Sequence, residues 1–330
     1  MRTRTVLPVL AAVALLAGAC GSATEATTNP DGSQNVTVAA NTAEGKPVQL
    51  TVPAVAEIRA KLPKDILDRG KLVIGVGALP AGAPPLSYVG TDQRTLTGSE
   101  PDLGRLVAAV LGLTPDVQNA SWQNLFVRLQ SGQFDAGFSN ITVTEERKQQ
   151  GFDFAAYRED NLGFEVNRTS TWQFGGNYEN LAGKAVAVDS GTNQEKILLQ
   201  WRDKLKAEGK KLDVRTFSGD KNGIYLGLAS HRIDAYFAPN PGIAYHVSQT
   251  AKTPNPTRNA GDYSGAGAGL QGLIAATTKK GNGLIAALGS AIDYLIQHGQ
   301  YAKWLAAYGL DSEAVKKAEI NPPGLPLSNS

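Results

Sequence analysis

From Ile58 onward, short runs of branched apolar residues alternate with longer segments of helical spacing, and this alternation constrains the fold more than any other feature. Residues 71–76 (KLVIGV) and 184–188 (KAVAV) are typical of buried strands, while residues 102–112 and 194–207 have the apolar spacing of helices. Strands that alternate with helices predict an α/β fold, in which helices cover both faces of a mostly parallel sheet.

The composition is that of a globular protein with a substantial core. The 330 residues allow two domains, and 42% of them are hydrophobic while 19% are charged. The net charge of +2 is spread along the chain without a basic block, which gives no indication of nucleic-acid binding. The three histidines lie far apart, and no Cys–His cluster or phosphate-binding loop occurs. We therefore expect neither a metal nor an organic cofactor.

The first 20 residues are typical of a secretory signal. Arg2 and Arg4 precede an apolar run over residues 6–19, which is shorter than the roughly 20 residues of a membrane-spanning helix. The run ends in Leu-Ala-Gly-Ala-Cys, which resembles a bacterial lipobox, although its leucine lies four residues before Cys20 rather than three. We predict a lipoprotein signal over 1–20 with Cys20 as the lipidation site, which places the mature chain outside the cytoplasm on a membrane. The alternative is an ordinary signal peptide with an incidental thiol.

Residues 21–53 are rich in Ser, Thr, Asn, Ala and Gly and have little apolar periodicity. Such a composition predicts a flexible tether between the lipid anchor and the folded part.

The stretch 139–147 is the most informative place for chemistry, because a predicted strand ends there and a helix begins. The N–H groups and dipole at a helix start favour an anion. Asn140 and Thr142 point to one side of an extended segment, and Arg147 adds a planar fork of donors suited to a carboxylate. The alternative is a plain capping box of Thr142 with Glu145 beside a surface arginine, and spacing favours neither interpretation.

A second strand-to-helix junction, at residues 188–193, has the same physical character. Gly191 allows close backbone approach, and Thr192 offers a hydroxyl and an N–H. Trp122 follows a strand and opens a helix, a position that suits either a cleft wall or core packing. Ligands of α/β sheets bind at the carboxyl ends of strands, so two such units could face one cleft.

Nine short segments between residues 66 and 310 match one protein family in order. They include GKLVIGV at 70–76, PPLSY at 84–88, TVTEER at 142–147 and SGTNQE at 190–195. On these segments the chain resembles the polar-amino-acid group (family 3) of extracytoplasmic solute-binding proteins of ABC transporters. The resemblance implies a periplasmic-binding-protein-like fold of type II, with two α/β lobes joined by a two-strand hinge.

By the same resemblance, lobe one comprises residues 54–157 plus 267–330 and lobe two comprises residues 158–266. Arg147 would then pair with the ligand's α-carboxylate. The other implied ligand contacts are hydrogen bonds from Thr142 and Asn140, donors from Gly191 and Thr192, and packing by Trp122.

One departure from the family pattern concerns the ligand's ammonium group. Many members have an aspartate five residues after the position of Asp234, where this chain has Pro239 followed by Asn240. A buried ammonium without a carboxylate is costly. Either Glu100 or Asp189 replaces the aspartate, or the ligand has a neutral or acylated nitrogen, for which Asn240 is a suitable partner.

These observations lead us to expect a binding protein rather than an enzyme. It would be a monomer that closes over a small carboxylate-bearing ligand, an amino acid or derivative, and passes it to an ABC permease. One alternative is a periplasmic lyase or dehydratase on the same fold, with Glu100 as the one candidate acid. Another is a ligand-sensing module that acts through a partner.

Overall fold

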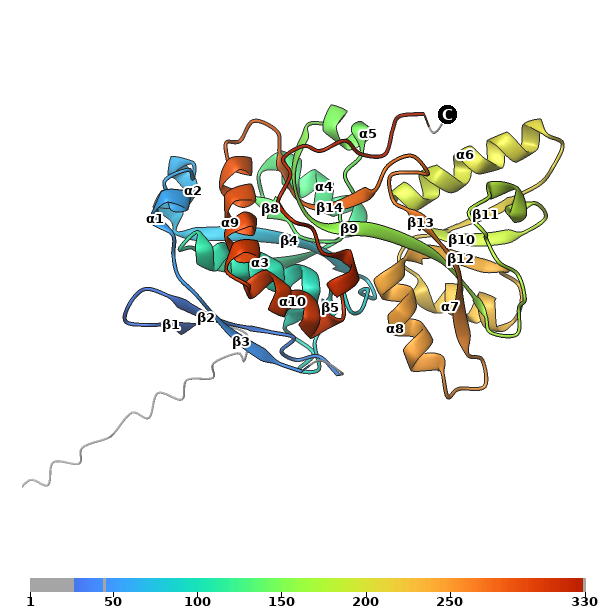
Figure 1. The fold of residues 1–330 in the computed structure, drawn as a ribbon, viewed down its shortest axis with the longest axis horizontal. Helices are drawn as coiled ribbons and strands as arrows, with labels where there is room; N and C mark the ends of the chain where they lie inside the picture. Colours follow the sequence, from blue (N-terminus) through green and yellow to red (C-terminus); the bar gives the residue numbers. More distant parts are fainter. Residues whose placement is uncertain (1–26, 44–45, 329–330) are drawn as a thin grey trace, which may run out of the picture.

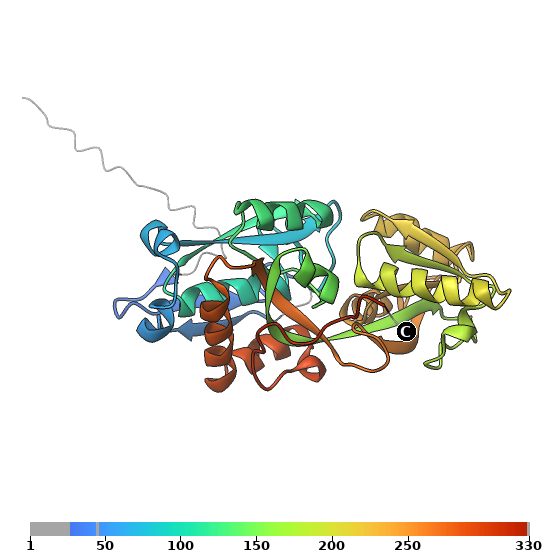
Figure 2. The same cartoon turned by 90° about the horizontal axis from the view of Figure 1, so that it is seen from above.

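The computed structural model describes residues 27–43 and 46–328, so the predicted signal segment and Cys20 lie outside the described residues. Two lobes lie side by side and are connected by the long strand β9 (Phe152–Asn167) (Figure 1, Figure 2). One sheet passes through both lobes. Its path is β11 (Asp213–Phe217), β10 (Ala185–Asp189), β12 (Ala235–Pro239), β9, β14 (Gly272–Lys279), β8 (Ala136–Gly137), β4 (Lys71–Leu79) and β7 (Thr114–Ser121), while β13 (Thr257–Ser264) also pairs with β9.

Strand β9 takes part in both lobes. Its first half pairs antiparallel with β14, and its second half pairs antiparallel with β12 and β13. The parallel pairs lie further out: β4 with β7 and β8 in the first lobe, and β10 with β11 and β12 in the second. The predicted α/β units therefore occupy the two outer parts of the sheet, and an antiparallel crossing joins them.

The helices begin and end at local sequence signals. Ser121 caps α4 (Trp122–Ser131) through its side chain, and Gly132 ends that helix in the left-handed conformation. Thr192 caps α6 (Asn193–Ala207) in the same way. Both helices agree with the sequence prediction. The remaining helices are α1 (Ala56–Arg59), α2 (Lys64–Arg69), α3 (Ser99–Val110), α5 (Glu145–Gln149), α7 (Lys221–Ala229), α8 (Asn240–Thr250), α9 (Ile285–Gln297) and α10 (Gln300–Tyr308).

Each lobe has its own buried apolar core. In the first lobe, β4 packs Leu72, Ile74 and Val76 into a cluster with α3, of which every residue is buried. In the second lobe the core is aromatic, and Phe164 stacks on Phe237 with ring centroids 4.4 Å apart. Separate cores allow the lobes to keep their structure while they move about the crossing strands.

The prediction of a flexible tether over residues 21–53 is wrong for the part that the structure describes. β1 (Thr27–Thr28), β2 (Gln34–Val38) and β3 (Val48–Val52) form an antiparallel sheet of three strands. The alternating Val-Thr-Val and Val-Gln-Leu-Thr-Val segments bury one face, a pattern that the polar composition of the stretch obscured. Four of these side chains join the first-lobe core: Val36, Val38, Leu50 and Val52.

The C-terminal segment runs across the first lobe past α5 and reaches the second (Figure 1). The backbone of Leu325 bonds to Val143 and Glu145, while its fully buried side chain belongs to the second-lobe cluster. In the described part of the chain, no helix is long and apolar enough to cross a membrane. Short elements complete the fold: β5 (Tyr88–Val89), β6 (Leu96–Thr97) and the 3₁₀ turns Tyr178–Leu181 and Asp311–Glu313.

Candidate functional site

A cavity of about 170 Å³ lies between the two lobes. The first lobe contributes segments that follow β4, β7 and β8, and the second contributes segments that follow β10, β11 and β12. Carboxyl ends of strands from both lobes therefore face one space, the usual location of ligands in α/β proteins. The lining side chains include Asn140, Asp189, Thr192 and Lys221 among the polar ones, and Trp122 and Phe237 among the aromatic ones.

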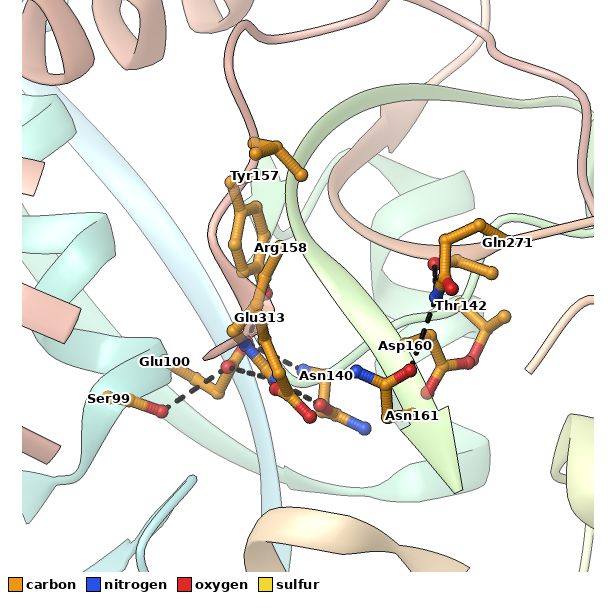
Figure 3. A network of polar contacts seen from close by, with 12 residues as sticks. Ser99, Glu100, Asn140, Thr142, Tyr157, Arg158, Asp160, Asn161, Gln271 and Glu313 are labelled. Atoms are coloured by element: carbon orange, nitrogen blue, oxygen red, sulfur yellow. Dashed lines mark hydrogen bonds and ion pairs between the residues drawn. The ribbon is translucent and has the colours of Figure 1, made fainter. Parts of the chain in front are cut away.

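Asn140 lines this cavity and is held from behind by a buried polar network (Figure 3). Its φ of 52° is in the left-handed region, which asparagine tolerates better than most residues. Its backbone N–H donates to Oε2 of Glu100 at 2.7 Å, and its Oδ1 accepts from Nη2 of Arg158. These anchors leave Nδ2 as the donor that Asn140 can offer to a ligand.

The prediction that Glu100 contacts a ligand is corrected by the structure. Glu100 is fully buried and does not line the cavity. Its carboxylate accepts hydrogen bonds from Tyr157 and Arg158 as well as from Asn140, and Arg158 also pairs with Glu313. Burial, reinforced by Glu100, raises the pKa of Tyr157 well above its usual value and keeps the phenol a donor. Glu100 therefore positions Asn140 instead of meeting a ligand.

Asp160 on β9, which sequence analysis did not identify, accepts hydrogen bonds from one side chain of each lobe. It accepts from Oγ1 of Thr142 at 2.7 Å and from Nδ2 of Asn193 at 3.3 Å. Burial raises the pKa of Asp160, while these hydrogen bonds oppose the shift. Thr142 is 1% exposed and lines neither this cavity nor the one described next, so its hydroxyl serves the crossing strand. The sequence signal that could have identified Asp160 is its position as an acidic residue among the apolar residues of a buried strand.

Arg147 is 7% exposed and is packed between aromatic rings and a backbone carbonyl. Its guanidinium carbon lies 5.0 Å from the ring centroid of Phe126 and 5.4 Å from that of Trp122. Its Nη1 donates to the carbonyl oxygen of Thr142 at 2.7 Å. The aromatic faces and the carbonyl hold the guanidinium plane in place without neutralising it.

The charge of Arg147 faces a second cavity that adjoins the first. Thr192 and Asn193 line both cavities, and Arg147 lines the second. Burial lowers the pKa of Arg147 to about 10, with Asp160 and Glu146 opposing the shift, so the side chain is cationic at neutral pH. None of the described carboxylates forms an ion pair with Arg147 within 4.0 Å. The second cavity thus has a buried cation in its wall.

Trp122 marks the place where the lobes touch and the two cavities adjoin. Its Nε1–H donates to the carbonyl oxygen of Gly191 at 3.0 Å, across the gap between the lobes. Trp122 lines the first cavity and Gly191 lines the second. The ring therefore serves as a cleft wall, one of the two interpretations that its sequence position allowed.

Gly191 and Thr192 bring the start of α6 to both cavities. Gly191 has a φ of 75°, and its N–H donates to Oε2 of Glu195 at 2.6 Å. The hydroxyl of Thr192 is used in capping, since it accepts from the N–H of Glu195 at 3.2 Å. The first N–H groups of a helix lack intrahelical acceptors and carry partial positive charge. The Gly191 N–H and the Thr192 hydroxyl, which the sequence suggested as donors to a ligand, are therefore engaged within the second lobe, and the residues that open α6 present their remaining N–H groups.

The structure also corrects the expectation for Asn240. Its Nδ2 donates to Asp262 at 2.9 Å and its Oδ1 accepts from Asn259 at 3.2 Å, and both partners lie on β13. Asn240 lines neither cavity, whereas the preceding Pro239 lines the first. Polar partners on the neighbouring strand draw the amide away from the gap between the lobes.

Asp189 is the one proposed replacement acid that lines a cavity, and its charge is already matched. Lys221 forms an ion pair with it, and the hydroxyl of Tyr236 donates to Oδ2 at 2.5 Å. Sequence analysis missed Lys221 and Tyr236 because each lies far from Asp189 along the chain. In the ranges 27–43 and 46–328, no group of three or more His, Cys, Asp or Glu side chains could hold a metal ion.

Comparison with known proteins places this site in context. The model of the family "Bacterial extracellular solute-binding proteins, family 3" matches residues 74–311. The chain is 28% identical over 248 residues to the L-cystine-binding protein TcyJ of Escherichia coli, a match that covers 73% of this chain and 85% of that protein. It is also 28% identical over 279 residues to the arginine-binding protein ArgT of Corynebacterium glutamicum, covering 83% and 85% of the two chains.

The alignments with solved structures of similar fold cover almost the whole length of those solved chains. An ancestral arginine-binding protein bound to arginine aligns with a TM-score of 0.61 at 25% identity, covering 73% of this chain and 98% of that one. The arginine-, lysine-, histidine-binding protein ArtJ from Geobacillus stearothermophilus aligns with a TM-score of 0.60 at 24% identity, covering 74% and 97%. The two-lobed α/β fold of periplasmic binding proteins, expected from the sequence, is thereby confirmed.

Proposed function

The chain belongs to the bacterial extracellular solute-binding proteins of family 3, and on this premise we propose that it captures an amino acid, or a derivative of one, for an ABC permease. The family and the curated relatives are binding proteins, so the chain is a receptor for a solute and not an enzyme. Cystine and arginine, named for two relatives, share an α-carboxylate and an α-ammonium.

The observation that carries the proposal is that one anion-binding environment receives a contribution from each lobe. Arg147 comes from the first lobe and the start of α6 from the second, and both line the same cavity. A carboxylate placed there would accept charge-assisted hydrogen bonds from a guanidinium fork and from helix N–H groups. Trp122 and Asn140, on the adjoining cavity, would supply an apolar wall and an amide donor for the rest of the ligand.

We further propose that binding closes the lobes about the crossing strands. The second lobe would comprise residues 158–266. The first would comprise residues 54–157 and 267–328 together with the N-terminal sheet that packs on its core. Contacts such as the Trp122–Gly191 hydrogen bond form across the gap, so closure and ligand burial would be one event.

The ligand proposal is tested with the purified chain from residue 21 onward. Its melting temperature is measured against L-amino acids, N-acylated amino acids, opines and small carboxylates without an amine. A ligand present at 100 times its dissociation constant stabilises a protein by about 2.7 kcal/mol. We expect a clear upward shift with at least one α-amino acid. No shift with any of these compounds would contradict the proposed function.

We also propose that the receptor is anchored to the membrane by a lipid on Cys20. Cells fed a labelled fatty acid should incorporate label into the wild-type chain, and the chain should fractionate with membranes. The variant Cys20→Ala should lose the label and leave the membrane fraction. Label-free wild-type protein would instead indicate an ordinary signal peptide.

A further inference from the structure

Three side chains of the second lobe form a closed polar cluster in the wall of the first cavity. Nζ of Lys221 donates to Oδ2 of Asp189 and to the hydroxyl of Tyr236, and that hydroxyl donates to the same Oδ2. Tyr236 is only 2% exposed, while the Asp189 and Lys221 side chains each keep 22% exposure. Both members of the ion pair line the cavity. The buried phenol thus fixes the pair from behind.

The cluster is neutral overall but leaves two hydrogen-bonding positions unused. An ammonium has three N–H groups, and a carboxylate has two oxygens that accept hydrogen bonds. Two of the Lys221 N–H groups are used inside the cluster, and Asp189 receives its bonds from Lys221 and Tyr236 on Oδ2. One N–H of Lys221 and the Oδ1 atom of Asp189 therefore remain for a group that enters the cavity. Burial and then Asp189 raise the pKa of Tyr236 well above its usual value, so the phenol keeps its proton.

The cluster lies on the second-lobe side of the cavity, with Asp189 at the end of β10 and Lys221 at the start of α7. Asp189 pairs with Phe217 on the outermost strand β11, and Gly219, just after that strand, also lines the cavity. A Cβ on Gly219 would lie 2.6 Å from Cδ of Pro80 in the first lobe, so the lobes meet closely there. Asn140, which follows β8 in the first lobe, lines the same cavity from the other side of the gap. The cavity thus has polar groups from both lobes.

We propose that Asp189 and Lys221 form a subsite that binds the neutral carboxamide end of an amino-acid side chain, as in glutamine or asparagine, and rejects a cationic end. This inference rests on the proposed function. The carboxamide oxygen would accept from Lys221 and its NH₂ group would donate to Oδ1 of Asp189, which satisfies both unused positions. A guanidinium or ammonium would instead meet the Lys221 cation at close range, with the Asp189 charge already matched. The relatives named for arginine would then differ from this chain at this end of the ligand.

Isothermal titration of the chain from residue 21 onward with L-glutamine, L-asparagine, L-arginine and L-lysine tests the subsite. We expect glutamine or asparagine to bind at least about tenfold more tightly than either cationic amino acid, because a like charge at a few ångströms in a partly buried site costs that much or more. Lys221→Met keeps the length of the stem and removes the cation. It should weaken the carboxamide ligand and strengthen arginine, which reverses the preference. Asp189→Asn keeps the cation and should weaken the carboxamide ligand without admitting arginine.

Lys184→Met is the matched control, because Lys184 belongs to the same lobe, lies 4.0 Å from Asp234 and does not line the cavity. It should leave the ratio of affinities unchanged. A purely structural ion pair would lower the melting temperature in Lys221→Met without changing that ratio. Preference of the wild type for arginine or lysine overturns the subsite while the proposed function stands, and this result needs no variant to fold. Absence of binding to any amino acid would remove the proposed function and the subsite together.

Discussion

At the scale of single residues, the buried charges of Arg147 and Glu100 differ in whether an ion-pair partner compensates them. Glu100 accepts hydrogen bonds from Asn140, Tyr157 and Arg158, so its negative charge is compensated inside the first lobe. Arg147 has a backbone carbonyl and two aromatic rings, but no carboxylate paired with it among the described residues. A buried charge without a counter-ion is costly. Arg147 is therefore the buried charge that a ligand could match, as proposed above, whereas the charge of Glu100 is matched by Arg158.

The first prediction concerns this arginine. Arg147→Ala should weaken the ligand found by the melting-temperature screen by orders of magnitude, because loss of a buried charge-assisted pair costs about 2–5 kcal/mol. Titration calorimetry measures the loss. Arg215→Ala, which removes a half-exposed arginine paired with Asp213 away from both cavities, serves as the control and should bind normally. Normal affinity in a folded Arg147→Ala protein would refute the assignment of the carboxylate site.

At the scale of elements, two segments outside the family match at 74–311 hold parts of the molecule together. The N-terminal sheet covers one side of the first-lobe core, and the C-terminal segment attaches to α5 while it packs into the second-lobe core. The N-terminal strands have alternating Val and Thr residues, whereas the C-terminal segment, rich in proline and glycine, has no such pattern. Their order comes from apolar side chains that fit existing cores, which is a tertiary effect.

A second prediction tests whether the N-terminal sheet is part of the folded unit. Leu50 is 4% exposed and belongs to the first-lobe core, whereas its neighbour Gln49 is exposed. Leu50→Ala should lower the free energy of unfolding by about 2–5 kcal/mol, as expected for a buried leucine. Urea unfolding measures the change, with Gln49→Ala as the control at near zero. Equal stability of the two variants would restore the tether interpretation.

The C-terminal segment carries a third prediction of the same kind. Leu325 is fully buried, while Leu327, two residues later, is 49% exposed. Leu325→Ala should destabilise the protein by about 2–5 kcal/mol, and Leu327→Ala should change stability little. Thermal unfolding of the two purified variants distinguishes them. If both behaved like the wild type, the segment would be a passive tail.

At the scale of the whole molecule, the lobes are independent cores that meet at few points. Trp122 bonds to Gly191, and Lys196 pairs with Glu146 at 2.8 Å across the same gap. The Lys196–Glu146 pair is partly exposed, and such pairs contribute about 0–1 kcal/mol. Polar contacts this weak do not by themselves fix the relative position of the lobes, whereas the C-terminal segment links them through Leu325, which bonds to Val143 and Glu145 and packs into the second-lobe core.

A fourth prediction uses tryptophan fluorescence to follow closure. Of the four tryptophans, Trp122 is the one that bonds across the gap, whereas Trp172 bonds within the second lobe. Ligand should change the emission of the wild type and of Trp172→Phe. The change should be largely lost in Trp122→Phe, provided that calorimetry shows ligand still bound. A full signal in Trp122→Phe would place closure elsewhere.

Local sequence determined the α/β class, most helix positions and the two helix starts that face the cavities. These features depend on periodicity and on caps such as Thr192 and Ser121, whose partners lie within three residues. The candidate site followed in part from the same local signals and in part from the family resemblance. Strand β9 was missed, since charged residues such as Arg158 and Asp160 interrupt its apolar pattern and are tolerated only because buried partners meet them.

The tertiary structure alone decided which side chains meet. Lys221 lies 32 residues from Asp189 in the chain, and Glu313 lies 155 residues from Arg158, yet each pair is in contact. Asn240 pairs with Asp262 on β13, and the buried Glu100 pairs with Arg158, because polar groups bond to the partners that the packed lobes place beside them. The spacing of residues in the sequence does not predict such partners. They depend on how the two cores pack and on where β9 crosses between the lobes.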